Sequence, residues 1–277
     1  MPNESNPDAW EGIVKLPWYD DVLHMLAVHR FVNLVGEPCT GKTTFAMAAA
    51  MRLSGELPVI LAGSPEIELA QMFGSYQLKQ EETPFVDGAL PLSLKSKRWL
   101  LIEEAALIPM DVRAALLTLR GASSITNPLN AERIQIPPAS QDNYDFRVVL
   151  TSNPESMRCH RGAAVSIARA LYDDVLTMEV PAMSTTDVVA FLRHNHPLAD
   201  SYRIHRVVEL WEDFRRIRSK TSSGDSEGYL TYRACSQVLK LLERGMREDV
   251  AIRVGFVTKF VVDDDLYAAA KLKAEIG

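Results

Sequence analysis

Residues 36–43 have a spacing that is suited to holding phosphate groups. The segment reads GEPCTGKT, which fits G-x-x-x-x-G-K-[ST] in full and lies between an apolar run and a helix-forming run. Its glycines let backbone N–H groups turn inward around phosphate oxygens, and the following helix N-terminus adds a positive dipole. We expect Lys42 to reach the β- and γ-phosphates and the Thr43 hydroxyl to bind Mg²⁺. The predicted nucleotide-binding residues are Gly36, Glu37, Pro38, Cys39, Thr40, Gly41, Lys42, Thr43 and Thr44.

Two adjacent acids end another apolar run, WLLIEE at 99–104. Because side chains alternate along a strand, we expect Glu103 and Glu104 to point to different sides of its end. Glu103 would then face a metal ion, and Glu104 would act as a general base on an attacking water. Two solvated glutamates at the end of a strand are the alternative interpretation.

A third polar group follows the run FRVVLTSNP at 146–154. Asn153 would lie at the edge of a sheet beside the phosphate site, where its amide could orient the water or contact the γ-phosphate. An asparagine that only forms a turn before Pro154 is the alternative. We therefore expect catalysis to depend on Glu104, Asn153 and Lys42.

The elements that must position these residues alternate between strands and helices. Helical patterns separate several apolar runs of strand length, which lie at 31–35, 57–62, 99–103, 146–151 and 175–180. This alternation predicts an α/β fold with a mostly parallel sheet that helices cover on both faces. Beyond Pro181 the patterns are helical, which predicts a second, small all-helical domain.

These changes of pattern divide the chain into four segments. They are an N-terminal tail at 1–20, an α/β nucleotide-binding domain at 21–182, a helical domain at 183–262 and a C-terminal tail or helix at 263–277. Within the α/β domain, residues 123–137 are typical of a β hairpin around an Asn-Pro turn.

Composition excludes several classes of protein. Hydrophobic residues make up 47% of the chain and charged residues 24%, unlike disordered or fibrous proteins. The net charge of −6 argues against a surface that coats nucleic acid. The chain has no apolar run of membrane-helix length and no signal-peptide pattern at its start, so we expect a cytoplasmic location and no membrane partner. Its 3 cysteines are widely spaced and predict neither a disulfide framework nor a zinc site.

Several segments, taken in order, resemble the AAA+ ATPases, and among them the MoxR and dynein-related (McrB-like) branch. The resemblance rests on GEPCTGKTT and on four further segments: AGSPEIELAQMFGSY at 62–76, DGALPLSLKSKRWLLIEEAALIP at 87–109, RVVLTSNPE at 147–155 and LTYRACSQVLKLLERG at 230–245. It implies a five-stranded P-loop domain with a small helical lid, and a ring, usually hexameric, that binds ATP and Mg²⁺ at subunit interfaces. It also implies that Arg233 contacts the γ-phosphate from the lid, with a helix-surface arginine as the alternative.

Two positions depart from the pattern of that family. Asp174 stands where the family normally has an arginine that reaches a neighbour's ATP, and Glu103 stands where Asp is usual. Arg158, Arg161 and Arg169 lie just upstream and could supply the missing arginine, although an ordinary surface or interface charge is the other interpretation of each. We therefore expect ATP binding to persist and hydrolysis to be slow or partner-stimulated.

Three functions compete at this level. The first is a ring ATPase that remodels or regulates a separately encoded partner protein, such as one with a von Willebrand factor A-type domain. The resemblance implies that segments 63–90 and 123–140 would lie on the working face of this ring. The second is a nucleotide-dependent scaffold with weak hydrolysis. The third is a nucleic-acid motor, suggested by six basic against three acidic residues between Arg203 and Lys220. Such a run is more often a solvated helix face or a subunit contact, so nucleic acid is not an expected partner.

Overall fold

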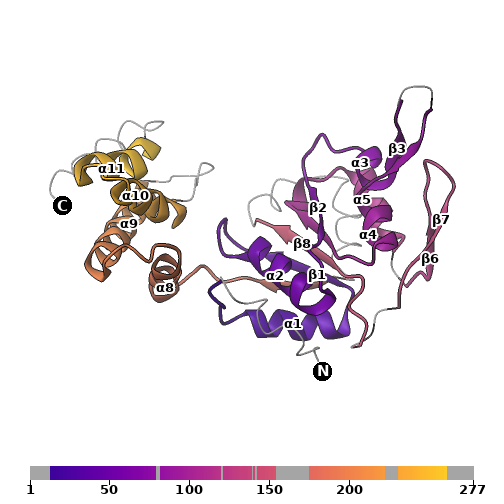
Figure 1. The fold of residues 1–277 in the computed structure, drawn as a ribbon, viewed down its shortest axis with the longest axis horizontal. Coiled ribbons are helices and arrows are strands. Elements are labelled where there is room, and N and C mark those ends of the chain that lie inside the picture. The colour runs from indigo at the N-terminus through magenta and orange to yellow at the C-terminus, as the bar shows by residue number, and fades with distance from the viewer. Residues whose placement is uncertain are drawn as a thin grey trace. The chain divides into compact units, whose positions relative to one another are not determined.

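The structure is a computed structural model of the 277-residue chain. It describes residues 13–78, 82–119, 121–138, 140, 142–153, 175–221 and 230–260, with the backbone alone at 217–221 and 260. The chain forms two compact units that meet in the sequence between Pro181 and Ala182 (Figure 1). The first unit contains a sheet with its helices, and the second contains helices.

The first unit is built on a parallel sheet of five strands. Their order across the sheet is β2 (Val59–Ala62), β5 (Leu100–Glu103), β8 (Val148–Ser152), β1 (Phe31–Val35) and β9 (Leu176–Glu179). Each adjacent pair is parallel, so the carboxyl ends of β1, β5 and β8 lie at the same edge of the sheet. All five strands lie at or within two residues of the predicted apolar runs, which confirms the predicted α/β class.

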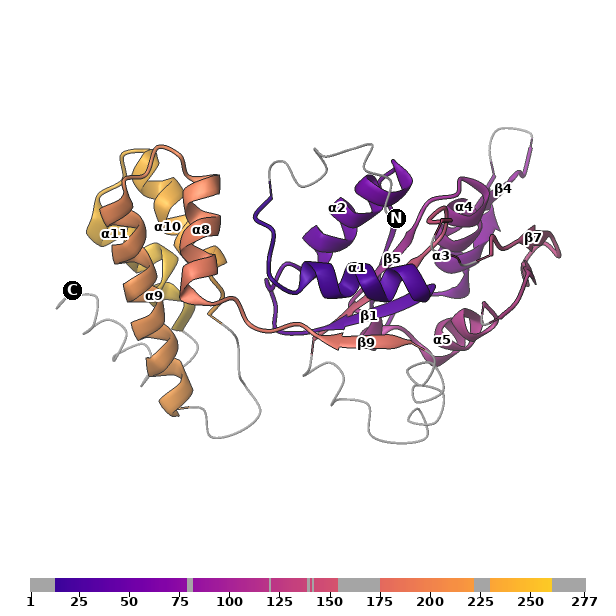
Figure 2. The ribbon, with the colours of Figure 1, turned by 90° about the horizontal axis from the view of Figure 1, so that it is seen from below.

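Two helices cover one face of the sheet (Figure 2). They are α1 (Tyr19–Val28) and α2 (Lys42–Ser54), and the ring of Phe45 on α2 lies 5.2 Å from Trp18 and 4.9 Å from Tyr19. Both of these aromatic residues are buried. The segment that carries Trp18 and Tyr19 is therefore packed into the first unit, because these aromatic side chains bury apolar surface against α2.

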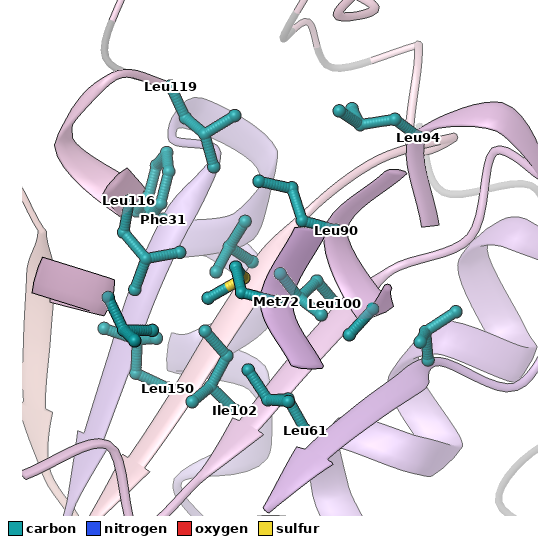
Figure 3. Packing of buried hydrophobic residues seen from close by; sticks show 14 of the residues in the cluster. Phe31, Leu61, Met72, Leu90, Leu94, Leu100, Ile102, Leu116, Leu119 and Leu150 are labelled. Carbon is teal, nitrogen blue, oxygen red and sulfur yellow. The ribbon is translucent and has the colours of Figure 1, made fainter. Parts of the chain in front are cut away.

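The opposite face carries the larger core. It is covered by α3 (Leu69–Phe73), α4 (Ala89–Lys95) and α5 (Met110–Leu117). Side chains from these helices meet the strand residues that point to the same side (Figure 3), among them Met72, Leu90, Leu116, Phe31, Leu100, Ile102 and Leu150. Strands that are buried on both faces carry apolar residues at nearly every position, which explains their continuous apolar runs.

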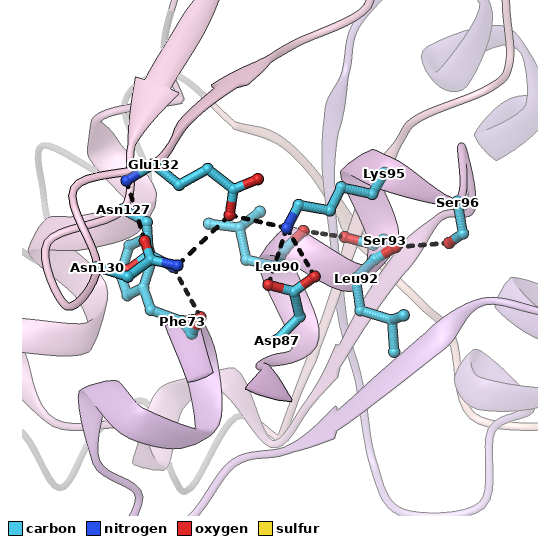
Figure 4. Close-up of polar contacts among 10 residues, drawn as sticks. All are labelled: Phe73, Asp87, Leu90, Leu92, Ser93, Lys95, Ser96, Asn127, Asn130 and Glu132. Carbon is cyan, nitrogen blue, oxygen red and sulfur yellow. Dashed lines mark hydrogen bonds and ion pairs between the residues drawn. The ribbon is translucent and has the colours of Figure 1, made fainter. Parts of the chain in front are cut away.

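Two hairpins project from this core and are linked to each other. They are β3 (Gly74–Tyr76) with β4 (Phe85–Asp87), and β6 (Ser124–Thr126) with β7 (Arg133–Gln135). Lys95 Nζ lies 2.8 Å from a carboxylate oxygen of both Asp87 on β4 and Glu132 beside β7 (Figure 4). The buried Asn127, in the turn of the second hairpin, donates a 3.0 Å hydrogen bond to the Phe73 carbonyl. The predicted hairpin at 123–137 is confirmed, and it is tied to the segment that precedes it.

The second unit packs helices around its own core. Its elements are α8 (Thr185–Asn195), α9 (Ser201–Thr221), α10 (Arg233–Glu243), α11 (Glu248–Gly255) and the 3₁₀ helix η3 (Val257–Phe260). Ser184 caps the N-terminus of α8 in a reciprocal pair with Asp187. In the buried ring of His196, Nδ1 lies 3.0 Å from Glu243 Oε1 and Nε2 lies 2.8 Å from Ser236 Oγ. The described part of this unit is helical, as predicted.

Candidate functional site

The phosphate loop begins where β1 ends. The Gly36 N–H donates a 3.1 Å hydrogen bond to the Ser152 carbonyl, and a Cβ at Gly36 would lie only 2.6 Å from the Val180 carbonyl oxygen. Only glycine allows this close approach. Farther along, Cys39 and Gly41 adopt left-handed conformations with φ of 69° and 90°. Residues of this kind in a tight turn aim successive N–H groups at one point, which favours an anion there.

Lys42 is the first residue of α2, and the residue is only 8% exposed. Its Nζ donates hydrogen bonds to the carbonyls of Gly36 and Glu37, both at 2.7 Å, and lies 3.4 Å from Asn153 Oδ1. Burial lowers the pKa of the Lys42 ammonium, whereas the charge of Glu104 raises it. The ammonium group thus sits inside the loop among weak carbonyl acceptors, where phosphate oxygens would be stronger partners.

Thr43 and Glu103 form the part of the site that is suited to a metal ion. The Thr43 hydroxyl donates a 2.6 Å hydrogen bond to Glu103 Oε1 at the end of β5. Within the described ranges, no group of three or more His, Cys, Asp or Glu residues could hold a metal. A hydroxyl and one carboxylate nevertheless fit Mg²⁺, which commonly takes one or two protein oxygens and completes its shell with water and phosphate oxygens.

Glu104 lies directly after β5 in a left-handed conformation, with φ 47° and ψ 43°. From the sequence, strand alternation was expected to separate the side chains of Glu103 and Glu104. This explanation does not apply, because the extended backbone ends at Glu103. Left-handed backbone at a residue other than glycine is strained and often occurs at functional sites. Glu104 Oε1 accepts a 2.8 Å hydrogen bond from Asn153 Nδ2, whereas the buried Oε2 has no partner among the described residues.

Asn153 joins the two charged groups of the site. It follows β8, and its amide contacts Glu104 through the nitrogen and Lys42 through the oxygen. Strands β5 and β8 are neighbours, and β1 on the other side of β8 leads into the loop that carries Lys42. The sheet therefore brings Lys42, Thr43, Glu103, Glu104 and Asn153 together at one edge, and the side chain of Asn153 does more than form a turn.

Gly63 is a site residue that the sequence analysis missed. Its N–H donates a 2.8 Å hydrogen bond to the Glu103 carbonyl. A Cβ at this position would lie 2.6 Å from the Glu103 carbonyl oxygen and 2.7 Å from that of Glu104. The absence of a side chain at Gly63 thus lets the chain after β2 pack against the two acids. The sequence signal for Gly63 is only that a glycine directly follows a strand. The residues that lie beside this glycine are known only from the order of the strands in the sheet.

The remaining predicted residues are placed as follows. Within the loop, Pro38 is half-buried, Thr40 is buried and Thr44 is exposed. Arg233 is exposed at the first position of α10 in the second unit, so its contact with a γ-phosphate stays a prediction. Four positions lie outside the described residues: Arg158, Arg161, Arg169 and Asp174.

Two arginines of the basic run on α9 pair with acids of the same helix. Arg206 lies 4.0 Å from Glu209, and Arg216 lies 3.8 Å from Glu212 and 3.5 Å from Asp213. Pairs of this kind are usual on a solvated helix face.

Across the described part of the chain, no helix has the length and apolar character needed to cross a membrane.

A five-stranded parallel sheet with a phosphate loop after β1 and two acids at the end of β5 defines a P-loop nucleotide-binding domain. The model of the AAA domain (dynein-related subfamily) matches residues 32–173. The chain belongs to this family.

Solved structures with a similar arrangement have low sequence identity. NtrX from Brucella abortus is 15% identical with a TM-score of 0.47, over 85% of this chain and 48% of that one. NtrX in complex with ADP is 15% identical with a TM-score of 0.43, over 80% and 44%. A candidate ATPase from Cytophaga hutchinsonii ATCC 33406 is 12% identical with a TM-score of 0.47, over 86% and 77%. The chain spans about half the length of the NtrX chains.

Proposed function

We propose that this chain is a MoxR-like ATPase subunit that binds ATP with Mg²⁺ and hydrolyses it in an oligomeric ring to remodel or regulate a separate partner protein. Membership of the dynein-related AAA family supports the nucleotide chemistry. The observation that carries the proposal is the contact between Asn153 and Glu104, which leaves one buried carboxylate oxygen of Glu104 without a partner among the described residues.

The ammonium of Lys42 supplies the main charge for binding. Its hydrogen bonds to the carbonyls of Gly36 and Glu37 can be exchanged for stronger ones to β- and γ-phosphate oxygens. The oxygens of Thr43 and Glu103 would hold the metal ion. Bound Mg²⁺ would neutralise charge on the phosphate oxygens.

Glu104 has the geometry of a general base. Asn153 holds one carboxylate oxygen, and the other, which has no partner among the described residues, would accept a proton from a water that attacks the γ-phosphate. The carboxylate of Glu104 accepts its hydrogen bond from Asn153, whereas that of Glu103 accepts one from Thr43. The two acids thus take separate roles, one toward the metal ion and one toward the water.

Replacement of Glu104 by Gln tests this assignment. Glu104→Gln keeps the shape of the side chain and removes its basicity, so turnover should fall by about 100-fold or more while ATP binding is retained. Glu56→Gln, an exposed change just after α2, is the matched control and should leave both unchanged. Phosphate release and equilibrium binding of ATP are the two measurements. Wild-type turnover in Glu104→Gln would overturn the assignment.

A nucleotide-dependent scaffold is the second candidate, and the same contact supports it. The Asn153 amide holds the Glu104 carboxylate, so hydrolysis can require a rearrangement that a partner triggers. The native mass should then increase with ATP while phosphate release stays at background. Affinity purification of the Glu104→Gln chain with ATP would identify the partner, and a von Willebrand factor A-type domain is the expected kind.

A further inference from the structure

A cavity of about 790 Å³ lies at the amino end of β1, away from the phosphate loop at its carboxyl end. Three segments form its walls: the connection between α1 and β1, the chain after α5, and the base of the β6–β7 hairpin. The walls are mainly apolar, with side chains such as Val28, Phe31, Leu119 and Ile136. The volume lies within the range of small-molecule sites in proteins, roughly 300–1,000 Å³.

Among the described residues of this lining, Arg30 is the one that carries a permanent charge. Its guanidinium donates hydrogen bonds to the carbonyls of Leu119 and Pro137, so it contacts two of the opposing walls. Both acceptors are neutral. The Nε atom is buried and has no hydrogen-bond partner among the described residues, and no described carboxylate forms an ion pair with Arg30. A buried donor without a partner is costly, and the guanidinium of the half-buried Arg30 would form stronger hydrogen bonds with an anion than with neutral carbonyls.

A second arginine adds positive charge behind this wall. Arg147 is buried, and among the described residues its hydrogen bonds go to carbonyls, those of Leu26, Phe146 and Ser140. Burial is the main reason that the pKa of Arg147 is lowered to about 10, against an opposing effect of Tyr144, and the charge of Arg30 acts in the same direction as burial. Asp145 acts the other way, but it also pairs with Lys97, at 3.7 Å. This end of the unit therefore has a positive potential that the described groups only partly balance.

We propose that the cavity binds a small carboxylate with an apolar body, a ligand that the nucleotide chemistry does not involve. The planar fork of a guanidinium matches a carboxylate, and the one arginine among the described lining residues favours one negative charge over two. The apolar walls would bury the rest of the ligand. Charge and shape thus point to the same class of molecule.

Octanoate is the probe for this site, with octanol as its neutral counterpart and octylammonium as its cationic one. The full chain should bind octanoate with saturable heat in a calorimetric titration, and the other two at least about tenfold more weakly, because a charged hydrogen bond to Arg30 is lost. The absence of saturable octanoate binding, or equal binding of octanol, would overturn the proposal.

Val28 allows a matched pair of variants that leaves Arg30 in place. It lines the cavity but is 68% exposed, so polar residues should be tolerated there. Val28→Glu adds a carboxylate to the cavity lining that contains Arg30 and should weaken octanoate binding by about tenfold or more, whereas Val28→Gln should change it less than about threefold. Equal effects of both variants, or no effect of Val28→Glu, would count against Arg30 as the anion-binding group. Circular dichroism of both variants checks that the fold is retained.

Discussion

The Thr43 hydroxyl donates a 2.6 Å hydrogen bond to the carboxylate of Glu103, although 60 residues separate them in the sequence. Thr43 lies in the first turn of α2 and Glu103 is the last residue of β5. A hydroxyl and a carboxylate held at this distance form a compact pair of oxygen ligands. The extra methylene of Glu103, relative to the Asp that is usual in the family, therefore does not prevent contact with the phosphate loop.

Removal of the hydroxyl at position 43 should weaken the response to Mg²⁺. Thr43→Val keeps the shape of the side chain but loses the metal ligand and the hydrogen bond to Glu103. The Mg²⁺ concentration for half-maximal turnover should rise by about tenfold to 100-fold. Thr43→Ser retains the hydroxyl and should stay near wild type. A Mg²⁺ titration of phosphate release measures both, and equal curves for Val and Ser would contradict this role.

A side chain at Gly63 should disturb the two acids without contacting the nucleotide. The Cβ of Gly63→Ala would lie within 2.7 Å of the carbonyl oxygens of Glu103 and Glu104, so the end of β5 must move. Displacement of a catalytic group by about 1 Å can cost on the order of 100-fold in rate, so kcat should fall far more than ATP affinity. Steady-state kinetics separate these two effects. The exposed neighbour change Ala62→Ser serves as the control, and a wild-type kcat in Gly63→Ala would remove Gly63 from the site.

The link between the two hairpins should depend more on Asn127 than on Lys95. Asn127→Ala removes a buried hydrogen bond to the Phe73 carbonyl, which should lower the free energy of unfolding by about 1–3 kcal/mol. Lys95→Met breaks contacts that lie partly in solvent, so it should have a clearly smaller effect. Urea unfolding ranks the two variants. A larger loss for Lys95→Met would show that the ion pairs, rather than the buried amide, link the hairpins.

The two described cysteines should differ in reactivity. Cys39 lies half-buried in the phosphate loop, whereas burial raises the pKa of the Cys235 thiol well above its usual range and keeps it protonated. In a Cys159→Ser background, iodoacetamide at pH 8 should label Cys39 and reduce ATP binding, and bound ATP should slow the labelling. Mass spectrometry of the labelled peptides measures this. Preferential labelling of Cys235 would contradict the assignment, and Cys39→Ser should be resistant to inactivation.

The phosphate loop and most of the strands and helices could be predicted from the sequence, because the sequence patterns that indicate them are local. The loop from Gly36 to Thr43 is contiguous, and its glycines, lysine and threonine act within one turn of the chain. Continuous apolar runs located the five strands, and the three central ones, β1, β5 and β8, are nearly all buried, whereas the edge strands β2 and β9 expose some of their residues. The helical patterns after Pro181 were equally direct, although α11, an element of eight residues, was too short to be predicted.

The tertiary structure decided how residues from separate strands meet. The order β2-β5-β8-β1-β9 places Asn153 between Glu104 and Lys42, and it places Gly63 against the two acids. The left-handed turn at Glu104 and the carbonyl-bound guanidinium of Arg30 also depend on contacts far apart in the sequence. The sequence by itself therefore determined which chemical groups are present and which strand or loop carries each one. Only the packed sheet determined their distances and partners, because hydrogen bonds and burial act between atoms that folding brings together.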